Sequence, residues 1–192
     1  MVNCALGATI TAHSGNGDSY QFDNCQFDNS SSIINAATSG IGIVINNCSV
    51  QSSTLIDCSA ATTSTDLVLY NCNFGNSCTY GIRAKNNFSA RITQCTTNQS
   101  MAYFIDDSAG GSNTYQIYNS VLLTSFGINS GPSSNFLIYN SYCNFPNGLT
   151  LGNNATLFFS SCNTAGSGAP TLGTGATVQY LDSLSGNGDK II

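Results

Sequence analysis

A short phrase recurs along the whole sequence: two apolar residues flank one other residue, and an asparagine and a cysteine follow two positions later. Clear copies are residues 43–48 (IVINNC) and 67–72 (LVLYNC). The asparagine-type positions are Asn3, Asn24, Asn47, Asn71, Gln94, Asn119, Asn140, Ser161 and Asp182, which lie 21 to 25 residues apart. A repeat of this length, held in register over the chain, is typical of a solenoid in which each coil buries its apolar face only by stacking on its neighbours.

A second apolar row keeps phase with the first. Ile10, Ile34, Ile56, Ile82, Ile105, Ile128, Leu151, Leu172 and Ile192 each follow an asparagine-type position by 7 to 11 residues. A third short strand is expected just after each asparagine turn. We therefore predict an all-β fold, a parallel β-solenoid of about nine coils with three parallel sheets. Residues 1–192 form one domain in this interpretation, which can also be a segment of a longer fibre or surface protein.

The asparagine turn predicts a structural ladder. In stacked coils about 4.8 Å apart, the amides of Asn24, Asn47, Asn71, Asn119 and Asn140 can hydrogen-bond along the axis. Cys25, Cys48, Cys72 and Cys95 follow this row and are expected to be small core residues. Their spacing exceeds the ~3.8 Å between the Cβ atoms of a disulfide, so we predict free thiols. Free thiols favour folding in a reducing cytoplasm before release.

Stacked coils, asparagines at the turn and inward isoleucine rows resemble the pectate-lyase-type right-handed parallel β-helix superfamily, over essentially the whole chain. The resemblance implies a right-handed solenoid. It leaves function open, because that superfamily includes polysaccharide lyases and hydrolases, viral tailspikes, adhesins and plain shafts.

Charge and composition exclude several functions. Four Lys and Arg against nine acidic residues give a net charge of -5, which disfavours binding to a phosphate backbone, so no nucleic acid is expected. No stretch approaches the ~20 apolar residues of a membrane span. The chain has one histidine, His13, and no Cys-x-x-Cys pair, so we expect no metal and no cofactor.

One charged row offers catalytic candidates. Alignment on the isoleucine row brings Asp57, Arg83 and Asp106 side by side, facing outward, with Asn129 and Gly152 in the following coils. Two carboxylates two coils apart lie ~9.6 Å from each other, near the ~6.5 to 9.5 Å of inverting glycosidases. Asp106 and Asp107 also resemble the paired aspartates of polygalacturonases, although that family's histidine motif has no counterpart here. A solvated row of ion pairs is the alternative, and we favour it.

The outward positions of the second strand are unusually apolar. They are Val44, Val68, Leu137 and Phe158 in one row, and Tyr70, Tyr118, Tyr139 and Leu181 in the next. Such a stripe predicts an interface or a ligand platform. We expect contact with further copies, as in a homotrimer, with neighbouring virion or surface proteins, or with a glycan.

These patterns favour a structural or receptor- and glycan-binding solenoid of a virion fibre, tailspike or capsid surface, located on a virion or outside the cell. The alternatives are a polysaccharide lyase or hydrolase that uses Asp57, Arg83, Asp106 and Asp107, and a cell-surface adhesin or self-assembling filament.

Overall fold

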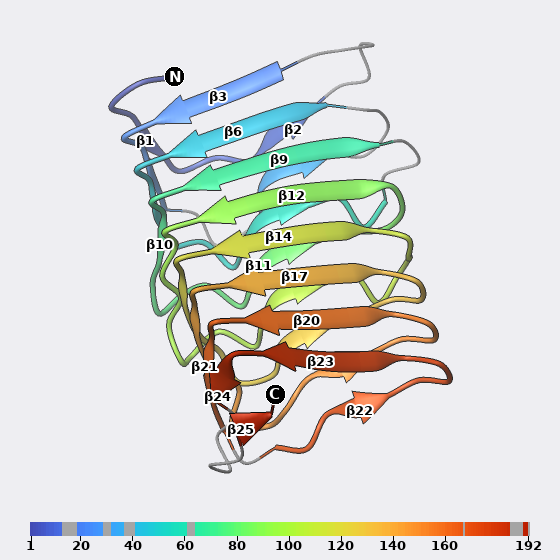
Figure 1. The fold of residues 1–192 in the computed structure, drawn as a ribbon. Coiled ribbons are helices and arrows are strands. Elements are labelled where there is room, and N and C mark those ends of the chain that lie inside the picture. The colour runs from blue at the N-terminus through green and yellow to red at the C-terminus, as the bar shows by residue number, and fades with distance from the viewer. Residues whose placement is uncertain are drawn as a thin grey trace.

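The computed structural model describes residues 1–12, 19–28, 32–36, 41–60, 64–166, 168–184 and 190–191. In these residues the chain forms short strands and no helix, and all but one of the strand pairings are parallel. Figure 1 shows the coils stacked along one axis, from β3 at one end to β23 near the other. The predicted all-β parallel solenoid is confirmed.

The sheet at the front of Figure 1, here called the wide sheet, has eight strands. In stacking order they are β3 (Ser19–Asp23), β6 (Gly42–Asn46), β9 (Thr65–Tyr70), β12 (Phe88–Thr93), β14 (Thr114–Tyr118), β17 (Asn135–Tyr139), β20 (Thr156–Ser160) and β23 (Thr177–Leu181). Along β9 buried and exposed residues alternate strictly, as expected for a strand with one face on the core. The inward residues stack in register, as in the pairing of Leu69 with Ile92 and of Ile92 with Ile117.

The second face, the isoleucine sheet, also has eight strands. They are β2 (Ile10–Ala12), β5 (Ser32–Ala36), β8 (Thr54–Asp57), β11 (Tyr80–Arg83), β13 (Tyr103–Asp106), β16 (Gly127–Asn129), β19 (Thr150–Leu151) and β22 (Thr171–Leu172). The predicted row is in register from Ile10 through Ile128, and Ile192 lies outside the described residues.

One step of the predicted alignment is wrong. Asn129 pairs with Thr150 rather than with Gly152. Leu149 and Leu151 are both buried and flank the outward Thr150, and a shift of two residues in a strand leaves every side chain on the same face. The apolar pattern therefore could not decide which leucine continues the isoleucine row.

The third face is narrower and is divided. Its first part holds β1 (Ala5–Leu6), β4 (Gln26–Phe27), β7 (Ser49–Val50) and β10 (Asn73–Phe74), and its second part holds β15 (Val121–Leu123), β18 (Tyr142–Asn144), β21 (Asn163–Ala165), β24 (Ser183–Leu184) and β25 (Lys190–Ile191). Single bridges from Thr96 to Asn73 and to Val121 join the two parts. The three predicted sheets are thus present, the third with a break, and β25 pairs antiparallel with β24.

The coil count is lower than predicted. Eight stacked strands correspond to seven turns from β3 to β23 in the described residues. The prediction of nine coils counted the turns at both ends of the row. Only an isolated bridge at Val2 precedes Asn3, and the described chain adds no wide-sheet strand after Asp182.

Candidate functional site

The asparagine row owes its identity to the backbone. All nine predicted positions have a positive φ between 48° and 54° or, at Gln94, 55°. The left-handed conformation is least costly for Gly, which has no Cβ, and among L residues for Asn and Asp, whose short polar side chains tolerate it. Each coil therefore turns from the wide sheet to the third face at one left-handed residue.

The predicted ladder residues Asn24, Asn47, Asn71, Asn119 and Asn140 all lie at this turn, with their side chains exposed. The main-chain N–H of Asn47 donates to the Tyr70 carbonyl, and that of Asn71 donates to the Thr93 carbonyl, each at 2.9 Å. The Asn71 amide also donates to the Asn47 side-chain oxygen at 2.9 Å. The row is therefore held by main-chain hydrogen bonds, and one hydrogen bond between side-chain amides is added in its middle.

A second left-handed row marks the turn into the wide sheet, and the sequence interpretation missed it. It consists of Asn87, Ser112, Ser133, Asn154 and Gly175. Each of these residues is glycine or polar and stands just before the start of a wide-sheet strand. Two of the five are serine, which indicates a left-handed turn less clearly than Asn or Gly does, so the pattern was not recognised in the sequence.

The cysteine row lies in the core. Cys25, Cys48, Cys72 and Cys95 are buried, and all nine cysteines of the chain are free. The Cys48 thiol donates to the Asn46 carbonyl at 3.1 Å, and burial raises its pKa to about 12. The thiol is therefore protonated at neutral pH and a poor nucleophile.

The charged row of the isoleucine sheet is assembled as aligned. Arg83 on β11 lies 3.3 Å from the Asp57 carboxylate and 3.9 Å from that of Asp106. Each carboxylate has a local donor as well, since Ser59 donates to Asp57 at 2.6 Å and Ser108 donates to Asp106 at 2.7 Å. The two predicted carboxylates thus share one guanidinium between them.

An aromatic row runs beside these charges. Tyr80 stacks on Tyr103 with ring centroids 6.1 Å apart, and Tyr103 stacks on Phe126 at 5.2 Å. Burial, with the Asp106 charge next in importance, raises the pKa of Tyr103. The sequence interpretation missed this row, although each of its members stands two residues before a residue of the isoleucine row.

Asp107 is separated from Asp106. Successive residues of an extended chain point to opposite faces, so Asp107 lies in the core with no exposed surface. Its carboxylate accepts hydrogen bonds from the Gly131 N–H, from the Asn113 amide at 3.0 Å and from the Ser134 hydroxyl at 2.8 Å. Burial outweighs these bonds and raises its pKa.

The Tyr115 hydroxyl is buried close to this carboxylate. Its burial and the Asp107 charge raise its pKa well above the usual range. Asp107 thus belongs to an interior polar cluster, and the four catalytic candidates do not form one site.

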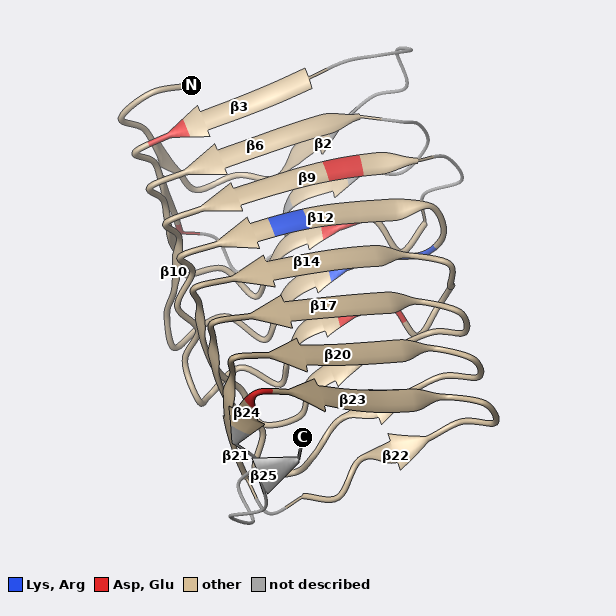
Figure 2. Cartoon of the chain, in the orientation of Figure 1, with Lys and Arg blue, Asp and Glu red and all other residues tan. Residues whose placement is uncertain are grey.

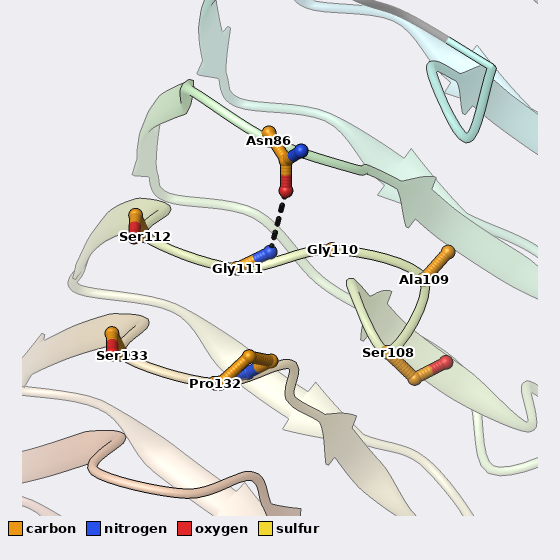
Figure 3. A pocket seen from close by; sticks show the side chains of 8 residues that line it. All are labelled: Asn86, Ser108, Ala109, Gly110, Gly111, Ser112, Pro132 and Ser133. Atoms are coloured by element: carbon orange, nitrogen blue, oxygen red, sulfur yellow. Dashed lines mark hydrogen bonds between the residues drawn. The ribbon is translucent and has the colours of Figure 1, made fainter.

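A shallow hollow of about 370 Å³ lies outside this cluster, over the turn between the isoleucine and wide sheets (Figure 3). Its lining is Asn86, Ser108, Ala109, Gly110, Gly111, Ser112, Pro132 and Ser133. The Asn86 side-chain oxygen accepts the Gly111 N–H at 2.9 Å and joins the two coils. The lining contains no titratable side chain, so the hollow offers no acid or base.

The predicted contact residues all lie on the outer face of the wide sheet. Val44, Val68, Leu137 and Phe158 share one column with Arg91, and Tyr70, Tyr118 and Tyr139 share the next with Thr93. Val68 and Tyr70 are 37% and 43% exposed, while the other five are half-buried. Tyr118 stacks on Tyr139 with ring centroids 5.2 Å apart, and Tyr139 meets the Phe158 edge at 6.1 Å.

This face carries little charge. Figure 2 shows the wide sheet almost free of charged segments, apart from acidic ones on β3 and β9 and a basic one on β12. The latter two are Asp66 and Arg91. A hollow of about 440 Å³ opens beside Arg91, lined by Val68, Leu69, Tyr70, Arg91, Thr93, Tyr118 and Asn119. The face thus combines an aromatic strip with a recess.

The comparisons give no relative: no family model matches the chain, and no match was found among curated proteins or solved structures. The described residues contain no helix long and apolar enough to cross a membrane. They also hold no cluster of three or more His, Cys, Asp or Glu side chains that is able to bind a metal ion.

Proposed function

We propose that this chain is a non-catalytic β-solenoid with a structural role, and that it binds glycan through the outer face of the wide sheet. The supporting observation is the nearly uncharged strip of Tyr70, Tyr118, Tyr139 and Phe158 on successive coils around Thr93, with a recess beside them. Aromatic faces aligned on a rigid sheet are suited to stacking on sugar rings, and their fixed positions lower the entropic cost of binding.

A catalytic role has less support. Asp57 and Asp106 are paired with Arg83, and the carboxylate of Asp107 is enclosed in the core. An inverting hydrolase needs one carboxyl group as acid and another as base, with space between them for water. Here the Arg83 side chain lies between the two outward carboxylates.

The natural setting that we propose is the surface of a virion, as part of a fibre, tailspike or capsid, or otherwise outside the cell. The nine free thiols support folding in a reducing compartment before release. We also propose that the chain is related to the pectate-lyase-type β-helices, and the stacked parallel coils support this proposal.

Lateral association is a second candidate. Leu137, Tyr139 and Phe158 lie on the adjacent strands β17 and β20 and leave an apolar strip half-open to solvent. Burial of such a strip at ~25 cal/mol per Å² favours association of copies, as in a homotrimer, or attachment to a neighbouring protein.

A binding assay tests the primary proposal. Immobilised oligosaccharides of varied composition are probed with the intact chain and with Tyr139→Ala. The control is Tyr142→Ala, which removes a tyrosine of similar accessibility from the third face (36% exposed). We expect binding by the intact chain and the control, and weaker binding by Tyr139→Ala. Absence of binding to every oligosaccharide, or an equal loss in the control, contradicts the proposal.

A further inference from the structure

The recess in the wide sheet results from one small residue in an aromatic column. Pairing places Thr93 between Tyr70 on one side and Tyr118 on the other. Tyr139 continues the column beyond Tyr118 and is stacked on it with the rings 9° from parallel. The column therefore has rings at three of four successive positions and a gap at Thr93.

The gap separates two rings of the column. Tyr70 and Tyr118 are two coils apart, a separation of about 9.6 Å. Stacked rings lie ~4.5 to 7 Å apart between centroids, so a ring above Thr93 is within stacking distance of Tyr70, while the Arg91 guanidinium covers the Tyr118 side of the gap. The recess volume of about 440 Å³ accommodates a sugar residue and part of its neighbour.

Arg91 supplies the charge at this gap. It lies on β12, two residues before Thr93, with the guanidinium carbon 5.7 Å from the Tyr118 ring centroid. Arg91 is exposed, and none of the ion pairs among the described residues involves it. A guanidinium held over an aromatic ring keeps its N–H edges free for an oxyanion, two oxygens of which it binds with two parallel hydrogen bonds.

From this arrangement we infer that the recess binds an anionic sugar residue of a glycan, whose ring packs against Tyr70 above Thr93 and whose acidic group pairs with Arg91. The acidic group is a carboxylate or a sulfate, because a guanidinium pairs with either. This inference rests on the proposed glycan-binding function and adds the class of sugar and its location.

Calorimetric titration with three probes tests the inference: a hyaluronan tetrasaccharide, which carries carboxylates, a sulfated dextran oligosaccharide, and maltohexaose, which is neutral. We expect at least one anionic probe to bind about tenfold more tightly than maltohexaose, because only an anionic probe forms charge-assisted hydrogen bonds with Arg91. The stronger of the two anionic probes identifies the acidic group.

Variants locate the site. Arg91→Gln is expected to remove the preference for the anionic probe, whereas Lys85→Gln, which changes the net charge equally at another position, keeps it. Thr93→Tyr fills the gap and is expected to abolish binding. Ser160→Tyr adds a tyrosine to the same column on β20, next to Tyr139, and is expected to bind as the intact chain does. Circular dichroism establishes that each variant is folded.

Three results overturn the inference. Equal binding of anionic and neutral probes leaves the proposed glycan-binding function standing and removes the role of Arg91. Anionic binding that survives both Arg91→Gln and Thr93→Tyr places the site elsewhere. If sedimentation shows self-association that Thr93→Tyr abolishes, while no probe binds, the recess receives a second copy of the chain and the glycan proposal fails with it.

Discussion

The side chain of Asn71 donates a hydrogen bond to the side chain of Asn47 one coil away, at 2.9 Å, and both residues have a left-handed backbone. Two different physical demands therefore meet at one position of the repeat. Every residue of the row must adopt a left-handed backbone conformation, whereas the hydrogen bond between side-chain amides needs asparagine in two successive coils.

Substitutions at Asn71 separate these demands. Asn71→Ala removes the amide and places a Cβ-bearing residue without a compensating side chain at positive φ, so we expect a loss of about 1 to 3 kcal/mol in the free energy of unfolding. Asn71→Gly relieves the backbone strain and loses only the hydrogen bond between the side-chain amides. Urea denaturation of both variants is the measurement. An unchanged midpoint for Asn71→Ala rules out a structural role for this residue.

Gly131→Ala tests how closely the coils approach. A Cβ at Gly131 would lie 1.6 Å from the Gly110 carbonyl oxygen of the preceding coil, so the backbone must move. The Gly131 N–H also binds the buried Asp107, and we expect a loss of more than about 2 kcal/mol or failure to fold. Gly42→Ala is the control, because the nearest atom to its added Cβ is 3.8 Å away. Similar thermal midpoints for the two variants contradict the close approach.

Asp107 makes stability depend on pH. Its pKa is raised in the folded protein, so the folded state binds this proton more tightly than the unfolded state, whose carboxyl has an ordinary pKa of ~3.9. Its stabilising contribution is complete below that value and is lost as the pH rises through the folded pKa. As the pH rises through this range, we expect the intact chain to lose unfolding free energy relative to Asp107→Asn, whose side chain does not titrate. Urea titrations at several pH values measure it, and a constant difference contradicts the assignment.

The outward charged row is expected to contribute little. Asp57→Asn and Asp106→Asn each weaken an ion pair with Arg83 in which the carboxylate is only 20% or 13% exposed and the guanidinium is 39% exposed. At contacts of 3.3 and 3.9 Å at the surface, each pair is expected to contribute roughly 0 to 1 kcal/mol. Both variants should fold with nearly unchanged thermal midpoints. They should also leave any polysaccharide cleavage intact, and loss of cleavage in both folded variants would establish the enzymatic alternative.

Phe158→Asp and Tyr139→Asp test association. Each places a charge in the apolar strip of the wide sheet and leaves the core intact, so we expect both to shift an oligomer toward monomer in sedimentation velocity. Gln179→Asp adds the same charge to the column of Phe158, one coil further, and should have a smaller effect. A monomer at high concentration for the intact chain rules out lateral self-association.

The sequence predicted the fold because stacking converts a linear repeat into columns. The register of Ile34, Ile56 and Ile82 followed from spacing alone. The ambiguous pair Leu149 and Leu151 led to the error, since both fit an inward position. Spacing predicted neighbours and failed to predict side-chain geometry.

The candidate site was likewise predictable only in part. The column of Tyr70, Tyr118 and Tyr139 was predictable from alternation in the strands, whereas the recess depends on the small size of Thr93 and on the side chain of Arg91 reaching toward Tyr118. Asp107 was expected beside Asp106, although the alternation of side chains along an extended chain already indicates that it points into the core. The row of Tyr80, Tyr103 and Phe126 required attention to residues preceding the isoleucines.

The hydrogen bonds of the wide sheet run along the solenoid axis, from one coil to the next. A pull on the two ends along this axis therefore loads the bonds of one outer coil before those of the next, because each coil contacts only its neighbours. The chain should then lengthen in steps of 21 to 25 residues under force, each step releasing one coil. A sideways load spread over many coils meets all their bonds together, so the rod should resist bending far better than peeling from an end.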